Sequence, residues 1–225
     1  MMIITDSTVF NTKAECIVNT INCVGLMGKG LALEFALRYP KLNEQYIEEC
    51  HNNLIHTGKV YFYEIDGQKI INFPTKFHFK YPSQMEWIEE GLKYFTENYK
   101  QWGFNSVAFP LLGASNGGLN PEEVEKVMIK YLSNLDIDVY ICRSKLVEGK
   151  ELEMINSFKE TPIDELKKYV RLTKKQITSL ENEQSKIVRF VDISKIKDIG
   201  AETYKSIFRL YYDGNIEFNK QLSLF

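Results

Sequence analysis

Strand-like apolar runs alternate with helix-like patterns over about the first 145 residues, which is typical of βαβ units around a largely parallel sheet. Asn120 and Pro121 supply a capping side chain and a first-turn proline for the last of the helices. The chain is therefore expected to form an α/β fold, whose ligands bind where the strands end. The expected strands are residues 16–20, 60–64, 69–73, 106–109 and 138–142, and the expected helices are residues 31–38, 43–50, 84–99 and 122–132.

Two glycine-rich loops follow expected strands. Residues 25–30 read GLMGKG and residues 113–119 read GASNGGL. Glycines let backbone N–H groups approach an anion without side-chain clashes. The first loop is not a nucleoside-triphosphate loop, because Cys23 stands where that motif needs glycine and Gly30 where it needs serine or threonine. Either loop alone is compatible with a plain turn, but together they indicate hydrogen-bond donors on two sides of a diphosphate.

The loop between these two presents an amine. Residues 72–76 read NFPTK, and the proline fixes the turn that leads to Lys76. Such a lysine is either a solvated surface residue or, if a cleft wall desolvates it and lowers its pKa, a nucleophile. His78 is expected either to contact substrate or move a proton, or simply to pack.

Taken in chain order, these motifs resemble those of the macrodomain family. They are Asp6, VNTIN at residues 18–22, the GLMGKG loop, NFPTK at residues 72–76 and LGASNGGL at residues 112–119. The resemblance covers roughly residues 1–145 and is specifically to the DNA ADP-ribosyl glycohydrolases typified by the DarG antitoxin. It implies a three-layer α/β/α fold with a central mixed sheet. It also implies a hydrolase that removes ADP-ribose from thymidine in DNA and so reverses the modification made by a DarT-type toxin. A hydrolase of small-molecule or protein-linked ADP-ribose esters, and a non-catalytic ADP-ribose reader, are the alternatives.

The resemblance implies a binding role for each matching residue. Asp6 would accept a hydrogen bond from the adenine amino group, and Asn22 with residues 28–30 would hold the distal ribose and one phosphate. Residues 113–118 would wrap the diphosphate. The expected ADP-ribose contacts are Asp6, Ser7, Asn22, Gly28, Lys29, Gly30, Leu31, Thr75, Gly113, Ala114, Ser115, Asn116, Gly117, Gly118 and Leu119.

The catalytic residues implied by the resemblance are Lys76, which would act on the anomeric carbon, and His78. A related branch has an acid–base aspartate where this chain has Gly117. Lys76 is therefore expected to act with another group or with assistance from the substrate.

The remainder of the chain has a different character and resembles no family. Residues 143–153 are expected to be a linker, and residues 155–225 a small α+β domain. Its expected elements are a helix at 161–180, a strand at 187–191, a helix at 201–210 and a hairpin at 211–218. The first helix carries a basic stripe, which is either a solvated face or a phosphate-contacting surface. Its members are Lys167, Lys168, Arg171, Lys174 and Lys175.

The last five residues resemble the pentapeptide with which bacterial proteins dock on the DNA polymerase sliding clamp. Gln221, Leu222, Leu224 and Phe225 would make the contacts, unless the segment is an ordinary amphipathic end. The net charge of −2 gives the whole molecule no attraction to nucleic acid or to a membrane surface. No signal peptide or membrane span is apparent, so a cytoplasmic protein is expected. No metal or other cofactor is predicted, since the only candidate ligands form a weak pattern, namely Cys50, His51 and His56.

Overall fold

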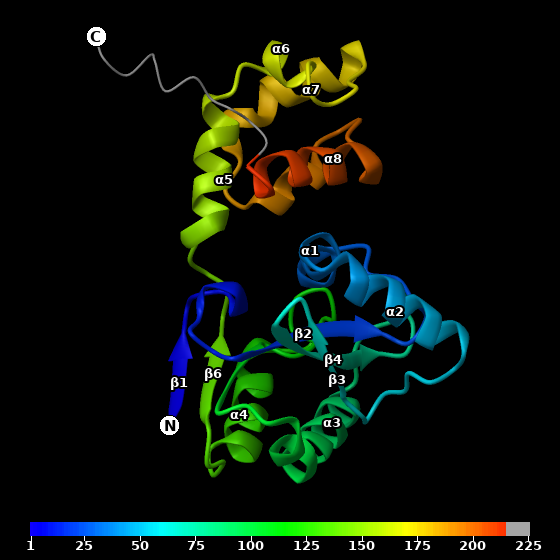
Figure 1. The fold of residues 1–225 in the computed structure, drawn as a ribbon, viewed down its shortest axis with the longest axis vertical. Coiled ribbons are helices and arrows are strands. Elements are labelled where there is room, and N and C mark those ends of the chain that lie inside the picture. Colours follow the sequence, from blue (N-terminus) through cyan, green and yellow to red (C-terminus); the bar gives the residue numbers. More distant parts are fainter. Residues whose placement is uncertain (215–225) are drawn as a thin grey trace. The chain divides into compact units, whose positions relative to one another are not determined.

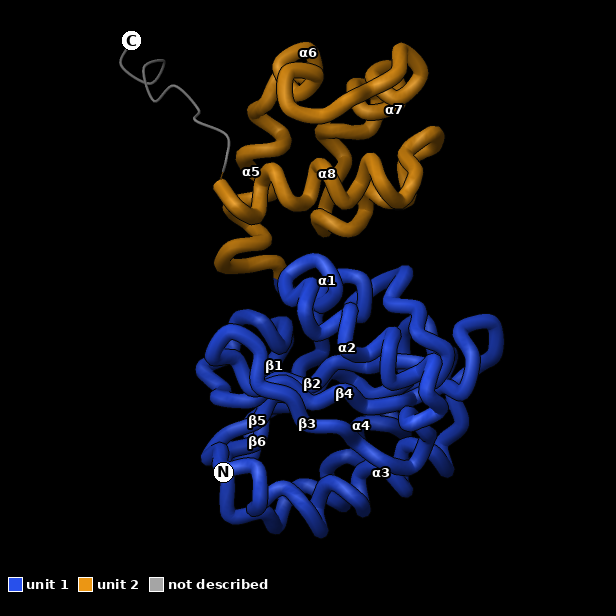
Figure 2. The backbone as a smooth tube through the Cα atoms, turned by 45° about the vertical axis from the view of Figure 1, so that its right-hand side comes forward, with its two compact units in different colours: residues 1–146 blue, residues 147–225 orange. Residues whose placement is uncertain are grey.

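A central six-stranded sheet organises the first of the two units into which the computed structural model divides the chain, Met1–Leu146 and Val147–Phe225 (Figures 1 and 2). The structure describes residues 1–214. The strand order is β1-β6-β5-β2-β4-β3, and every neighbouring pair is parallel except β3 and β4. The mixed sheet inferred from the family resemblance is thus confirmed. The strands are β1 (Met2–Thr5), β2 (Cys16–Asn22), β3 (Tyr61–Ile65), β4 (Gln68–Lys76), β5 (Ser106–Pro110) and β6 (Asp138–Cys142).

The five strands expected from the sequence are all present, and β1 is an additional one. β1 lies at the sheet edge and pairs with β6, so that Met2 is opposite Val139. Its apolar run is only four residues long, too short to stand out as a strand without its partner. β4 extends to Lys76, beyond the expected end at residue 73, and so carries the lysine into the sheet.

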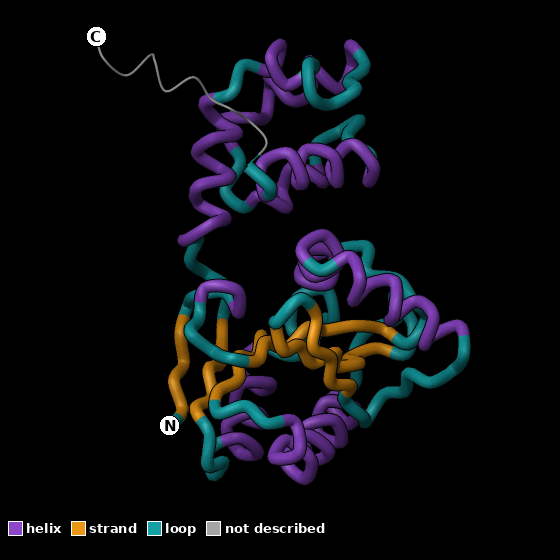
Figure 3. Tube along the Cα trace, viewed as in Figure 1, coloured by secondary structure: helices purple, strands orange, loops and turns teal. Residues whose placement is uncertain are grey.

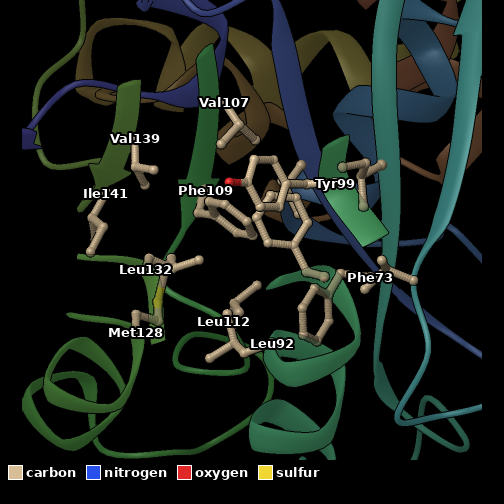
Figure 4. Packing of buried hydrophobic residues seen from close by; sticks show 14 of the residues in the cluster. Phe73, Leu92, Tyr99, Val107, Phe109, Leu112, Met128, Leu132, Val139 and Ile141 are labelled. Carbon is tan, nitrogen blue, oxygen red and sulfur yellow. The ribbon is translucent and has the colours of Figure 1, made fainter. Parts of the chain in front are cut away.

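Helices cover both faces of this sheet and complete three layers (Figures 1 and 3). Successive side chains of a strand point to opposite faces of the sheet, which explains why hydrophobic residues pack on both faces. Phe109 packs with the residues of α3 and α4, whereas its neighbour Ala108 packs on the opposite face with Phe35 of α1. Figure 4 shows the first core, where Phe73 and Leu92 lie close to Leu112. The helices are α1 (Gly30–Arg38), α2 (Pro40–His51), α3 (Met85–Asn98) and α4 (Pro121–Leu132), with single 3-10 turns η1 (Val9–Asn11) and η2 (Tyr99–Trp102).

The first-turn chemistry expected for α4 is confirmed. The Asn120 side chain accepts hydrogen bonds from the backbone N–H groups of Glu122 and Glu123, at 2.9 and 3.3 Å. Pro121 is the first helical residue, where its missing N–H has no cost. This cap fixes the point at which the preceding glycine-rich loop must end.

The described part of the second unit, residues 147–214, is helical and contains no strand, so the expected α+β composition is wrong for this part of the chain. Four helices and two 3-10 segments enclose an aromatic core in which Phe158, Phe190 and Tyr211 meet, with ring centroids 5.6–6.1 Å apart. These elements are α5 (Gly149–Glu160), α6 (Ile163–Leu166), α7 (Lys174–Glu183), η3 (Gln184–Lys186), η4 (Phe190–Lys195) and α8 (Ala201–Tyr212).

Three further expectations for this unit are wrong. The helix at 161–180 is interrupted after Leu166, because Thr173 and Gln176 form a reciprocal capping box that starts α7 afresh. The strand at 187–191 is replaced by η4, which begins at Phe190 and buries that ring in the core. Residues 211 and 212, where the expected hairpin would begin, end α8 instead, and residues 215–218 of that hairpin lie outside the described residues. The expected linker also ends early, since α5 starts at Gly149. The clamp-like residues 221–225 lie outside the described residues.

Candidate active site

The three sequence loops meet at one edge of the sheet. β2, β4 and β5 are neighbours and run parallel, so their carboxyl ends lie together. The Cys23 backbone N–H donates to the Phe77 carbonyl at 3.0 Å, which joins the first loop to the segment after β4. The Lys76 amine donates to the Asn116 carbonyl at 2.5 Å, which joins β4 to the third loop. The expected convergence of the loops is therefore confirmed.

The first loop is held in shape by Asn22, the last residue of β2. Its amide nitrogen donates to the Leu26 carbonyl at 2.7 Å, and its amide oxygen accepts from the Val24 N–H at 2.9 Å. The Tyr46 hydroxyl, from α2, donates to the backbone carbonyl of Asn22 at 2.9 Å. Asn22 is buried, so its side chain stabilises the loop from the inside of the protein. Tyr46 is a supporting residue that no local sequence pattern reveals, because it lies 24 residues after Asn22.

The anion-binding potential of the first loop lies in its last residues. Gly28 and Lys29 are exposed, and Gly30 begins α1, so the N–H groups of the first helical turn are directed towards the loop. A Cβ on Gly30 would lie 2.5 Å from the Asn116 amide nitrogen, and its φ of +56° also favours glycine. Gly30 thus allows the first and third loops to approach each other.

The third loop is a tight turn closed by its own backbone. The Leu119 N–H donates to the Gly113 carbonyl at 3.1 Å, and the Ser83 N–H donates to the Gly117 carbonyl at 2.9 Å. Gly113 and Gly118 have φ values of +70° and +79°, which only glycine adopts without strain. Ser115 and Asn116 are exposed at the tip of this loop.

Ser83 is a site residue that the sequence analysis does not include. It lies just before α3 and is buried beneath the third loop, and its hydroxyl has no hydrogen-bond partner among the described residues. The positions that a Cβ would take on Gly113 and Gly117 are 3.0 and 2.4 Å from this hydroxyl oxygen. A serine just before a helix is usually interpreted as an N-terminal cap of that helix. Nothing in the sequence therefore links Ser83 to residues 113–119.

Gly117 has no room for any side chain. A Cβ there would lie 2.0 Å from the Gly113 carbonyl oxygen and 2.4 Å from the Ser83 hydroxyl. An acid–base aspartate therefore cannot occupy this position with the present backbone. This agrees with the expectation that Lys76 acts without a carboxylate from this loop.

Lys76 is the last residue of β4 and is half-buried, following the fully buried Thr75. Burial lowers the pKa of the Lys76 ammonium, because desolvation penalises the charged form. In the sheet, Lys76 is in register with Asn22, directly after an irregularity at which Thr75 is an extra residue on β4. The amine is thus positioned by a strand rather than by a free loop, and a larger neutral fraction is available for nucleophilic attack.

His78 lies two residues beyond the lysine in a short turn. Its Nδ1 accepts a hydrogen bond from the Lys80 N–H at 3.2 Å, so the neutral ring carries its proton on Nε2. The ring stacks on Phe79 with centroids 4.3 Å apart. His78 therefore has a packing role, and its catalytic role stays a prediction.

Asp6 and Ser7 follow β1 at the same edge of the sheet, because β1, β6, β5 and β2 are parallel. The backbone carbonyl of Asp6 accepts from the Lys145 N–H at 2.8 Å, and its carboxylate lies 3.9 Å from the Arg143 guanidinium. Arg143 in turn binds Glu125 through two hydrogen bonds of 2.7 and 2.8 Å, which lower the pKa of that carboxyl. The Arg143–Glu125 ion pair thus holds a positive charge close to Asp6. From the sequence, Arg143 was expected only to be part of a linker.

Two negative findings concern the described residues 1–214. No group of three or more His, Cys, Asp or Glu side chains is arranged to hold a metal ion there. In the same part of the chain, no helix is both long and apolar enough to cross a bilayer.

Comparisons with known proteins agree with this geometry. The Macro domain family model matches residues 18–128. The DNA ADP-ribosyl glycohydrolase of Mycobacterium tuberculosis is 40% identical over 146 residues, covering 61% of this chain and 42% of that protein. A DNA ADP-ribosyl transferase–DNA ADP-ribosyl glycohydrolase fusion protein of Thermosipho africanus is 33% identical over 155 residues, covering 60% of this chain and 40% of the fusion. This chain thus spans less than half the length of either relative.

Two further relatives match over nearly their whole length. The ADP-ribose 1''-phosphate phosphatase of Lodderomyces elongisporus is 30% identical over 141 residues, covering 57% of this chain and 88% of the phosphatase. The solved macrodomain of Mycobacterium tuberculosis DarG superposes with a TM-score of 0.61 at 36% identity, covering 63% of this chain and 97% of that structure. Because this chain covers 97% of that solved macrodomain at 36% identity, and the residues matched by the Macro domain family model include all three loops, this chain belongs to the macrodomain family.

Proposed function

We propose that this macrodomain hydrolyses the bond between ADP-ribose and a thymidine base of DNA. The observation that carries the proposal is the Lys76 amine, held 2.5 Å from the Asn116 carbonyl at the point where the three loops meet. Two relatives with 33% and 40% identity are DNA ADP-ribosyl glycohydrolases in whole or in part, which supports DNA as the acceptor.

In the proposed reaction, the loops bind ADP-ribose and Lys76 attacks its anomeric carbon. Residues 28–30 and 113–118 bind the diphosphate through backbone N–H groups, while Asp6 accepts a hydrogen bond from adenine. Binding energy from these remote groups orients the reacting bond. The neutral amine of Lys76 forms a bond to the anomeric carbon as the base leaves with the electron pair. Water then releases ADP-ribose and regenerates the amine.

The test compares wild type with Lys76→Ala on an oligonucleotide that carries one ADP-ribosylated thymidine. Wild type is expected to release ADP-ribose, and the variant to release none while still binding free ADP-ribose by calorimetry. Lys76→Arg serves as the matched control, because it keeps a positive charge but remains protonated at every accessible pH. Hydrolysis by either variant at the wild-type rate would exclude Lys76 as the nucleophile.

A second candidate function is hydrolysis of small ADP-ribose derivatives. It is favoured by the similarity to an ADP-ribose 1''-phosphate phosphatase, which covers 88% of that protein. The same cleft would bind ADP-ribose, but the group removed from the ribose and transferred to water would be an acyl or a phosphoryl group. O-acetyl-ADP-ribose and ADP-ribose 1''-phosphate, assayed beside the oligonucleotide, distinguish the two functions. Binding without turnover of any substrate would leave an ADP-ribose reader.

The proposed setting is the bacterial cytoplasm, with a DarT-type toxin as the source of the modified DNA. The Thermosipho africanus relative, in which a transferase and a glycohydrolase are fused, supports this pairing. The sequence at Gln221–Phe225 further suggests docking on the DNA polymerase sliding clamp. Binding of the full chain to purified clamp, lost in a Leu224→Ala/Phe225→Ala variant, tests that contact.

A further inference from the structure

An unusual cluster of exposed aromatic side chains lies beside the proposed nucleophile. In the segment directly after β4, Phe77, Phe79 and Tyr81 are 59%, 43% and 63% exposed. We call residues 77–81 the aromatic loop. Large aromatic side chains are normally buried, and an exposed group of them marks a binding surface. Its position, starting one residue after Lys76, places this surface at the entrance to the reacting bond.

We propose that the aromatic loop binds single-stranded DNA by stacking on the bases that flank the modified nucleotide. The proposal rests on the DNA-directed activity above and specifies how the enzyme would recognise the strand rather than ADP-ribose. Every base has a π-face, so exposed aromatic rings bind single strands without needing a particular sequence.

Backbone hydrogen bonds and ring packing shape the aromatic loop. The Phe77 carbonyl accepts from the Cys23 N–H at 3.0 Å, and the Tyr81 N–H donates to the His78 carbonyl at 3.1 Å. The His78 ring packs on Phe79 at 4.3 Å and near Tyr81 at 5.6 Å, between ring centroids. This packing restricts the Phe79 and Tyr81 rings before DNA binds, which reduces the entropy cost of association.

Charge favours nucleic acid over an apolar protein segment as the occupant. Lys80 lies between two of the exposed rings in sequence, with its amine 5.8 Å from the Phe79 centroid. Aromatic side chains interleaved with cations are suited to bases joined by phosphates. Since the net charge of the chain is −2, such local cations must supply the attraction to DNA.

The test uses the full chain and changes the rings while keeping an apolar surface. Phe77→Leu/Tyr81→Leu removes both rings, and the matched control Phe77→Trp/Tyr81→Phe retains aromatic rings at both positions. Affinity for an unmodified, fluorescein-labelled single-stranded oligonucleotide is measured by anisotropy. The ratio of kcat/KM on an ADP-ribosylated oligonucleotide to that on ADP-ribosylated thymidine nucleoside is measured in parallel. Circular dichroism confirms that each variant is folded.

The Phe77→Leu/Tyr81→Leu variant, called here the leucine pair, is expected to bind the oligonucleotide on the order of 10-fold more weakly or worse, since loss of stacking on one base lowers the affinity by about this factor. The ratio of kcat/KM values should fall with it, and the aromatic control should retain both. If the leucine pair binds the oligonucleotide as wild type does, the stacking proposal is wrong, and the exposed rings serve a protein contact instead. If wild type hydrolyses neither substrate, the proposed function fails, while the anisotropy comparison still decides whether the loop stacks on bases.

Discussion

Gly117→Ala is the substitution whose effect follows most directly from the packing of the third loop. The added Cβ would lie 2.0 Å from the Gly113 carbonyl oxygen and 2.4 Å from the Ser83 hydroxyl. The first of these atoms is backbone and cannot rotate away. It also accepts the Leu119 N–H at 3.1 Å, and the Gly117 carbonyl accepts the Ser83 N–H at 2.9 Å. Relief of the clash must therefore move residues that hold the loop closed.

The expected destabilisation is about 2–5 kcal/mol. Loss of one or both hydrogen bonds contributes about 1 kcal/mol each, and overpacking contributes about 1–3 kcal/mol. Gly118→Ala is the matched control in the same loop, because a Cβ there meets nothing within 4 Å. Its φ of +79° leaves only the cost of a left-handed alanine, about 1–2 kcal/mol.

Urea unfolding followed by tryptophan fluorescence measures both values. Trp87 and Trp102, the two tryptophans of the chain, lie in the first unit, so the signal reports the macrodomain. Gly117→Ala should have the lower midpoint at an unchanged slope, and it should also weaken ADP-ribose binding, because the diphosphate loop is displaced. A midpoint equal to that of wild type, or above that of Gly118→Ala, would refute the packing argument.

Two other expected outcomes follow from burial. Desolvation lowers the pKa of Lys76, and only the neutral amine attacks. The rate of hydrolysis should therefore rise with pH and level off below the usual lysine pKa of about 10.4. A pH–rate profile that falls over this range would contradict the nucleophilic role. In the second unit, one oxygen of the buried Glu151 carboxylate accepts from the Arg189 guanidinium at 2.7 Å and from the Phe190 N–H at 3.0 Å. Glu151→Ala should cost about 2–4 kcal/mol, since it removes a charged acceptor of the Arg189 guanidinium and the acceptor of the buried Phe190 N–H. Hydrogen exchange of the α8 backbone amides measures this loss of stability, with Lys150→Ala as the surface control. Unchanged protection in Glu151→Ala would show that the Glu151–Arg189 pair is not needed for stability.

The first unit was largely predictable because its signals are local. The apolar runs at 16–20 and 138–142 become β2 and β6, and Asn120 with Pro121 begins α4 as expected. Parallel strands then bring their carboxyl ends to one edge, so the loops that follow β2, β4 and β5 are sufficient to place the site. The order of motifs along the chain, rather than any one of them, indicated the family.

The second unit was predicted less well because its apolar residues do not fix the element type. The spacing of Ile163, Leu166 and Val170 fits a continuous helix, but tertiary packing accepts a short α6, a turn and a new start at Thr173. Residues 187–191 read IVRFV, a short and mainly apolar run that predicts a strand. In the folded unit, the Phe190 ring and its N–H are instead fixed by Phe158 and Glu151. Short apolar runs of this kind are decided by what they pack against.

The sequence by itself determined the α/β class, the three loops and the presence of Lys76 just after an apolar strand, because each depends on residues adjacent in the chain. Only the tertiary structure showed that Ser83 lies beneath Gly117, that Tyr46 braces Asn22, and that the lysine amine reaches the Asn116 carbonyl. These contacts join residues 24–40 positions apart. No local pattern encodes such pairs, since they exist only once the sheet has brought the strand ends together.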